Sequence, residues 1–154
     1  ACLIELSRHR LASYTVKSSR YTLKELKKEA EFIREGVNEK GNISITITDE
    51  LVERASKYVV LTGNSQVDTS IMEALENLRF MILQDIPNDI AKYCMPEAYK
   101  TSLVMTINAR ALQNFLTLRS SKHALKEIQE LARNMFEVLP QDHKFLFEGI
   151  FDEN

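Results

Sequence analysis

The sequence predicts an α+β protein in which helices pack around a small central β-sheet, as a single domain over residues 1–154. Only four glycines and three prolines interrupt the chain, which favours helices over a loop-rich all-β fold. Most apolar residues recur every three or four positions, and two short segments carry the alternating or β-branched pattern of strands. A chain of 154 residues is long enough to bury one core.

The first part of the chain predicts two helices separated by an extended segment. Residues 1–6 are apolar at helical spacing with no N-cap residue ahead of them, so we expect the chain to start inside a helix and further residues to precede it. In residues 13–17, hydroxyl side chains alternate with larger ones, which fits either an edge strand or a phosphate-binding segment. A capping box from Thr22 to Glu25 predicts a surface helix that ends at Gly36. Its apolar stripe is Leu26, Ala30 and Ile33.

The middle of the chain predicts a strand followed by helices. Three isoleucines alternate with polar residues over 43–47 and indicate a short half-buried strand, after which residues 48–50 open a helix. A second capping box, from Ser70 to Glu73, predicts the start of another helix. Its apolar residues are Ile71, Leu75, Leu78 and Ile82, at intervals of four, three and four.

The last part of the chain predicts a strand and two helices after a short helical turn. Residues 88–95 lie between two prolines and are predicted to form one or two helical turns. Residues 101–107 are rich in β-branched side chains and predict a strand that leads into a helix carrying Leu112, Phe115 and Leu116. A further helix is predicted from residue 121 or 122. Its apolar face is Ala124, Ile128, Leu131, Met135 and Val138.

Positive charge is concentrated in two segments of a chain whose net charge is −2. Residues 1–21 and residues 108–123 each carry a net charge of +3. A nucleic-acid-binding domain usually has a pI above about 9, whereas this sequence has a pI of about 6.0, so we expect small phosphorylated ligands and no nucleic acid. We name residues 1–21 and 108–123 the first and second basic segments.

Composition also limits location and metal chemistry. No apolar run approaches the roughly 20 residues that span a bilayer, and the start lacks the basic region of a signal peptide, so we expect a cytoplasmic protein with no membrane partner. Cys2 and Cys94 are far apart and lack zinc-ligand spacing, which predicts neither a disulfide nor a metal site. For Cys94, a buried inert thiol is favoured over a nucleophile.

The candidate ligand-binding residues each have a plainer interpretation. If the first helix continues through Arg8, His9 and Arg10, their side chains fan out and can hold phosphate, although an isolated motif of this kind is more often a solvated helix end. Asn108, Arg110, Asn114 and Arg119 place amides and guanidinium groups within a few helical turns, with Asn114 and Leu118 on one face. His123 is more often structural at such a position, and His143 is predicted to lie on the surface.

Taken together, the two basic segments resemble the flavin-dependent thymidylate synthases. That family has the pattern R-H-R-x-x-S followed by S-x-R-Y, matched here by residues 8–13 and 18–21. Its A-R-x-x-L-P element corresponds to residues 91–96, and N-A-R-x-L-x-N-F-L-x-L-R corresponds to residues 108–119, with His123 four residues on. Two separated motifs in the right order make the resemblance specific, and it reaches from residue 1 to about 139.

The resemblance implies an enzyme and its ligands. Members of the family are homotetramers with active sites where subunits meet, and they methylate dUMP to dTMP with methylene-tetrahydrofolate as carbon donor and NADPH-reduced FAD as hydride source. By motif position, the residues implied to contact FAD are Arg8, His9, Arg10, Asn108, Arg110, Asn114, Leu118 and His123. Those implied to bind the nucleotide are Glu5, Ser18, Ser19, Arg20, Lys92 and Arg119.

Two of these residues are implied to act on the reacting ring. Arg119 would stabilise negative charge on the uracil, and Ser18 would position the ligand through its hydroxyl and make no attack itself. No cysteine need attack the pyrimidine in this family.

The sequence departs from the family at several positions. Thr15 and Val16 replace Asn and Glu, Lys92 replaces Arg, and a leucine replaces Gln at position 125. Glu5 replaces Gln, and its carboxylate would repel a dianionic nucleotide unless an arginine pairs with it. The family's N-terminal section has no counterpart before Ala1. A non-catalytic nucleotide- or flavin-binding remnant, or a truncated form of the fold, is therefore the alternative function.

Overall fold

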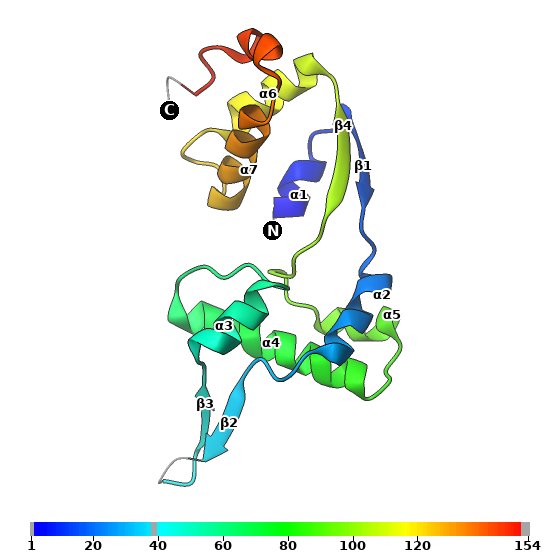
Figure 1. The fold of residues 1–154 in the computed structure, drawn as a ribbon, viewed down its shortest axis with the longest axis vertical. Helices are drawn as coiled ribbons and strands as arrows, with labels where there is room; N and C mark the ends of the chain where they lie inside the picture. The colour runs from blue at the N-terminus through cyan, green and yellow to red at the C-terminus, as the bar shows by residue number, and fades with distance from the viewer. Residues whose placement is uncertain (1, 38–39, 152–154) are drawn as a thin grey trace. The chain divides into compact units, whose positions relative to one another are not determined.

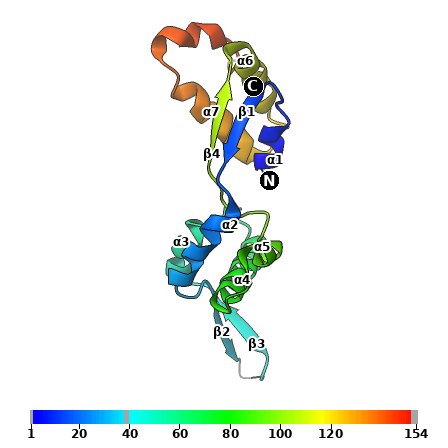
Figure 2. The ribbon, with the colours of Figure 1, turned by 90° about the vertical axis from the view of Figure 1, so that its right-hand side faces the viewer.

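The computed structural model describes residues 2–37 and 40–151, apart from the side chains of Ser19 and Arg20. It divides into two compact units. The terminal unit comprises the described residues of Ala1–Thr15 and Leu103–Asn154, and the inserted unit comprises those of Val16–Ser102. Figure 1 and Figure 2 show the elements of each unit.

The terminal unit packs helices beside a two-stranded sheet. Helix α1 (Cys2–Ser7) leads to strand β1 (Ala12–Val16), which pairs with β4 (Leu103–Ile107). After β4 come α6 (Ala109–Arg119), α7 (Lys126–Glu137) and the 3-10 helix η3 (Gln141–Phe147). In both ribbon views α1, α6 and α7 lie together (Figures 1 and 2). Its buried core is Leu6, Leu112, Phe115, Leu116, Ile128, Ala132 and Phe147.

The inserted unit is helical and carries one hairpin. Its first elements are α2 (Ser19–Thr22), the 3-10 helix η1 (Leu23–Lys28), β2 (Arg34–Val37) and β3 (Ile43–Thr46). They are followed by α3 (Asp49–Ser56), α4 (Ser65–Leu83), α5 (Asn88–Ala91) and the 3-10 helix η2 (Lys92–Cys94). The core includes Leu23, Leu26, Phe32, Leu51, Leu75 and Leu78, each fully buried.

The predicted mixture of helices and a small amount of sheet is confirmed, but the sheet is not central. The described residues form two separate two-stranded sheets, β1 with β4 and β2 with β3. The turns over 88–95 and the helix following Asn108 form as predicted, and the strand predicted over 101–107 forms from Leu103 to Ile107. Among the described residues, no helix has the length and apolarity needed to cross a bilayer.

The predicted helix over residues 22–36 is wrong. Thr22 ends α2, Leu23–Lys28 is a 3-10 helix, and Glu29 is already extended at φ −88° and ψ 147°. The backbone beyond it is held by side chains instead of by helical hydrogen bonds. Glu76 accepts the amide proton of Phe32 at 2.8 Å, Arg54 donates to the Glu31 carbonyl at 2.6 Å, and Arg79 donates to the Glu29 carbonyl at 3.3 Å.

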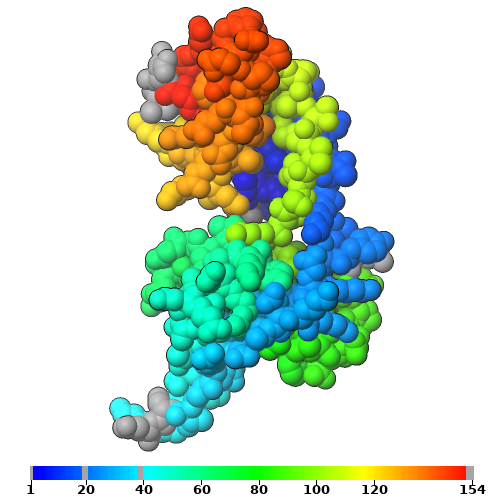
Figure 3. All heavy atoms as spheres, viewed as in Figure 1, coloured from blue at the N-terminus to red at the C-terminus, as the bar shows by residue number. Residues whose placement is uncertain are grey.

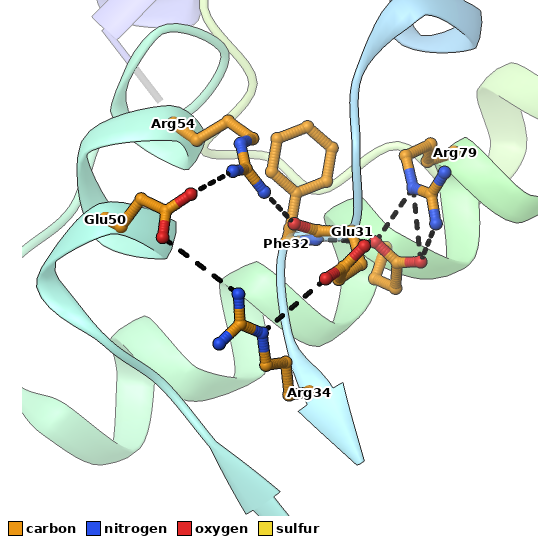
Figure 4. A network of polar contacts seen from close by, with 7 residues as sticks. Glu31, Phe32, Arg34, Glu50, Arg54 and Arg79 are labelled. Atoms are coloured by element: carbon orange, nitrogen blue, oxygen red, sulfur yellow. Dashed lines mark hydrogen bonds and ion pairs between the residues drawn. The ribbon is translucent and has the colours of Figure 1, made fainter.

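Figure 4 shows how these side chains converge from α3 and α4 on the segment before β2. Arg79 also forms a salt bridge to Glu76 at 2.5 Å, and both side chains are mostly buried. These tertiary contacts satisfy backbone groups that a helix would have satisfied locally, and Phe32 fills the core. Local propensity is a weak preference that such packing overrides.

The β2–β3 hairpin includes the predicted strand, but β3 ends at Thr46, and of the three isoleucines predicted to be half-buried only Ile47 is, against the core of the inserted unit. The two strands pair antiparallel, from Arg34 opposite Thr46 to Val37 opposite Ile43. Ile43 is 75% exposed and Ile45 is 38% exposed. In Figure 3 the hairpin, coloured cyan, projects from the helices of its own unit.

Two predicted helices begin elsewhere than the sequence suggested. Helix α4 starts at Ser65, because the side chain of Asn64 accepts the amide protons of Gln66 and Val67 and caps it. Ser70 is inside this helix and donates to the carbonyl of Gln66. Helix α7 starts at Lys126, four to five residues later than predicted.

Cys94 also differs from expectation, since its thiol is exposed instead of buried. It ends η2, a single 3-10 turn that contains no buried residue. His143 lies on the surface in η3, as predicted.

Candidate functional site

A cavity of about 1050 Å³ lies within the terminal unit. It is lined from one side by the loop that follows α1 and from another by the start and the exposed face of α6. The predicted ligand-binding residues that line it are Arg8, His9, Arg10, Asn108, Arg110, Asn114, Leu118 and Arg119. Parts of both basic segments therefore meet in one cavity of a single chain.

Residues 8–10 form a loop, so the condition under which their side chains would fan out from the first helix is not met. Helix α1 ends at Ser7, and the amide of His9 donates to the Leu6 carbonyl at 3.1 Å, closing a turn. The hydroxyl of Tyr14, on β1, donates to the carbonyls of Leu6 and His9 at 2.9 Å each. Burial raises the pKa of Tyr14, so its hydroxyl remains a donor at neutral pH. A strand side chain thus fixes the loop.

The second wall of the cavity is the junction between β4 and α6. The side chain of Asn108 caps α6 by accepting the amide proton of Ala111 at 2.8 Å. Arg110, in the first turn, donates to the side-chain oxygen of Gln113 at 3.3 Å. Amide groups at the start of a helix favour an anion, and a guanidinium beside them adds to that preference.

Arg119 ends α6 and contacts two residues of the α1 segment. Its Nη1 donates to the Glu5 carboxylate at 2.6 Å, its Nη2 donates to the Glu5 carbonyl at 3.0 Å, and its Nε donates to His9 Nε2 at 2.9 Å. The side chain of Arg119 is only 15% exposed. Arg119 is therefore the arginine that pairs with the Glu5 carboxylate and offsets its repulsion of an anionic nucleotide.

His9 acts as a hydrogen-bond acceptor and is therefore neutral, with its proton on Nδ1. Burial lowers the pKa of His9, the positive charge of Arg119 lowers it further, and the carboxylate of Glu5 opposes both effects. The ring packs edge-on against buried Phe115, with centroids 4.8 Å apart. Its orientation is set by the core of the terminal unit.

The electrostatic character of the cavity is cationic. Four arginines line it, at positions 8, 10, 110 and 119, against one carboxylate, that of Glu148. Glu5 offsets part of this charge through Arg119 and through Arg8, whose Nη1 lies 3.6 Å from Glu5 Oε1. An anionic ligand with polar ring edges suits the remaining guanidinium groups and the amides of Asn108 and Asn114.

Several predicted site residues are not part of this cavity. His123 is exposed in the loop before α7 and is not among the residues that line it. Ser18 and Lys92 belong to the inserted unit and do not line it either, and Lys92 lies 5.6 Å from the Tyr93 ring centroid. Ser19 and Arg20 are on α2, with side chains outside the described part of the chain.

Several residues that line the cavity were not predicted from the sequence. Gln113 and Thr117 lie on the same face of α6 as Arg110 and Asn114, so helical spacing from those residues was enough to find them. Gln113 also donates to the carbonyl of Leu146 and so links α6 to η3. Glu148, on the segment after η3, carried no signal in the sequence.

Comparison with known proteins places the chain in a family. Residues 1–143 match the family model described as thymidylate synthase complementing protein. The flavin-dependent thymidylate synthase of Campylobacter jejuni strain RM1221 is 56% identical over 96% of this chain, and that of Wolinella succinogenes is also 56% identical over 96%. The chain spans about 64% of the length of the Campylobacter protein.

Solved structures show the same relationship. The crystal structure of thymidylate synthase X from Helicobacter pylori with FAD and dUMP has a TM-score of 0.86 and 48% identity, covering 98% of this chain and 67% of that one. A UMP/dUMP methylase from Streptomyces cacaoi, at 22% identity and a TM-score of 0.61, shares the fold. The chain belongs to the thymidylate synthase complementing protein family, whose curated members named above are flavin-dependent thymidylate synthases.

Proposed function

We propose that the protein is a flavin-dependent thymidylate synthase. It methylates dUMP to dTMP in the cytoplasm, with methylene-tetrahydrofolate as the carbon donor and NADPH-reduced FAD as the hydride source. The observation that carries the proposal is the cavity in which Arg8, His9 and Arg10 meet Asn108, Arg110 and Asn114. These are residues that the family resemblance assigns to FAD.

The residues of the cavity fit FAD. A volume of about 1050 Å³ is just above the range of small-molecule sites, roughly 300–1000 Å³, so there is room for a dinucleotide. Arg8, Arg10 and Arg110 supply cationic donors for a pyrophosphate, and the start of α6 adds oriented backbone amides. Helicobacter pylori thymidylate synthase X has been crystallised with both FAD and dUMP.

In the proposed mechanism the chain positions ligands and stabilises charge. FAD, when bound, supplies the hydride chemistry. Arg8, Arg10 and Arg110 hold the pyrophosphate, and the amides of Asn108 and Asn114 orient polar ring edges. Arg119 places guanidinium N–H groups against the uracil and stabilises the negative charge that develops when C5 becomes nucleophilic.

The nucleotide phosphate is assigned to a second group of residues. By the family motif, Ser18, Ser19, Arg20 and Lys92 bind dUMP, with Arg20 and Lys92 neutralising the dianion. We further propose a homotetramer with active sites where subunits meet. Ser18 positions the ligand, and exposed Cys94 has no part in the reaction.

A visible absorption spectrum tests the proposal. Purified protein given FAD, dUMP and NADPH should show flavin absorbance that bleaches, and adding methylene-tetrahydrofolate should release dTMP. Arg110→Ala should weaken FAD binding about tenfold, the effect of losing one charge-assisted contact of about 1.4 kcal/mol. Arg133→Ala, an exposed arginine on α7 outside the cavity, is the matched control and should leave FAD binding unchanged.

Two results would count against the enzyme. Protein that retains no flavin absorbance once unbound FAD is removed excludes a flavin site. Protein that binds FAD and dUMP but releases no dTMP supports the alternative, a non-catalytic binding remnant of the fold.

A further inference from the structure

The guanidinium of Arg119 is fixed from two directions by the α1 segment. An arginine has five N–H groups, and the contacts to the Glu5 carboxylate, the Glu5 carbonyl and His9 Nε2 use three of them. One N–H remains on each terminal nitrogen. Since Arg119 lines the cavity, these two are the donors it can present to a ligand there.

The Glu5 carboxylate pairs with Arg119 and lies near Arg8. Its Oε2 accepts from Arg119 at 2.6 Å, and its Oε1 lies 3.6 Å from Arg8, so both carboxylate oxygens face cations of this chain. The Glu5 side chain is 29% exposed. A carboxylate that already accepts from Arg119 offers no donor to a nucleotide phosphate.

His9 completes the arrangement from the other side. Its Nε2 accepts from Arg119 Nε at 2.9 Å, and its ring edge contacts fully buried Phe115. A short charge-assisted contact on Nη1 and a neutral acceptor on Nε together leave the guanidinium plane little freedom to rotate.

We propose that Glu5 is a positioning residue that directs the two remaining N–H groups of Arg119 at the pyrimidine, with His9 as the second acceptor. This role rests on the proposed thymidylate synthase function. It replaces the nucleotide contact that the sequence resemblance implied for Glu5. A misplacement of about 1 Å in such a group can cost about 100-fold in rate, so the acceptor that fixes it matters as much as its charge.

Three substitutions at Glu5 separate position from charge. Glu5→Gln removes the charge but keeps an oxygen at the same reach, so kcat should fall less than about fivefold. Glu5→Asp keeps the charge but withdraws the carboxylate by one methylene. Glu5→Ala removes both the charge and the oxygen acceptor. Each of these two variants should lower kcat by about 10- to 100-fold. FAD bound per protein, read from flavin absorbance, should not change. Glu130→Ala, an exposed carboxylate on α7, is the control and should leave kcat unchanged.

A double-mutant cycle tests whether Glu5 acts through Arg119. In an Arg119→Ala background, Glu5→Ala should lower kcat by less than about twofold further, because residues that act as one unit are not additive. Should Glu5→Ala fail to fold, the same cycle is run with Glu5→Asp. Thermal unfolding of each variant separates a structural loss from a catalytic one.

The outcomes are distinct. Wild-type protein that forms no dTMP overturns the proposed function and this role with it. With an active wild type, unchanged kcat in Glu5→Asp and Glu5→Ala overturns the positioning role alone. So does a Glu5→Gln enzyme slower than Glu5→Asp, because that order means charge matters and geometry does not. Losses that multiply in the Arg119→Ala background overturn it as well.

Discussion

Replacing Tyr14 by phenylalanine tests how the loop of residues 8–10 is held, because it removes one hydroxyl and keeps the ring. That hydroxyl shares its proton between the Leu6 and His9 carbonyls at 2.9 Å each. The Leu6 carbonyl also accepts the His9 amide proton, so the loss falls mainly on the His9 carbonyl. One neutral hydrogen bond contributes about 0.5–1.5 kcal/mol, and an under-satisfied carbonyl adds to this. We expect the free energy of unfolding to fall by about 1–2 kcal/mol.

The same change should weaken FAD binding. If the hydroxyl favours the observed loop by about 1 kcal/mol, its loss raises the apparent Kd for FAD by up to about fivefold. Denaturant unfolding measures the first effect, and titration of flavin absorbance measures the second.

Tyr58→Phe is the matched control. The Tyr58 hydroxyl donates to the Glu29 carboxylate at 2.7 Å within the inserted unit. Its removal should cost about 1.5–3 kcal/mol of stability, as for a bond to a charged group, with no change in the Kd for FAD. Unchanged stability and FAD binding in Tyr14→Phe, or equal weakening of FAD binding by Tyr58→Phe, would refute the reasoning.

Three further predictions concern stability. Phe115→Ala empties a fully buried site and should lower the free energy of unfolding by about 3–5 kcal/mol, measured by denaturant titration; a cost under about 1 kcal/mol would show that the core of the terminal unit does not depend on it. Arg79→Ala leaves the mostly buried Glu76 carboxylate without its cation and should cost about 2–4 kcal/mol, whereas Arg133→Ala should stay within about 0.5 kcal/mol. Because burial and Arg119 lower the pKa of His9, the unfolded chain binds this proton more readily. The stability that neutral His9 contributes is therefore complete above pH 6.5, and it is lost as the pH falls from 6.5 to the pKa of His9 in the folded protein. An NMR titration of His9 with a midpoint at or above pH 6.5 would contradict this.

The sequence predicted those elements whose local signals agree with their packing. Leu75, Leu78 and Ile82 recur at helical spacing and are all buried on α4, and Asn108 caps α6 at the predicted strand-to-helix junction. The prediction of a helix was wrong over residues 29–36, because the side chains of Arg54, Glu76 and Arg79 form hydrogen bonds with the backbone there. Those partners are distant in sequence, and no local pattern announces them.

The site was predictable to the extent that its residues share an element. Arg110, Asn114 and Leu118 lie on one helix face, so spacing alone brings them together. That Arg119 pairs with Glu5 and His9 depends on how α1 packs, which the sequence does not encode locally. His123 matches the family motif, yet it lies in the loop before α7, outside the cavity.

The terminal unit is built from two segments that are far apart in the sequence, and this affects how it forms during synthesis on the ribosome. Residues 2–15 are translated before the whole of residues 16–102, and only then do residues 103–151 follow. At a synthesis rate of about 5–20 residues per second, α6 is made on the order of ten seconds after the segment with Arg8 and His9. The inserted unit is complete in the nascent chain by then, so the arginine-lined cavity is the last part of the described protein to form, and premature termination abolishes it first.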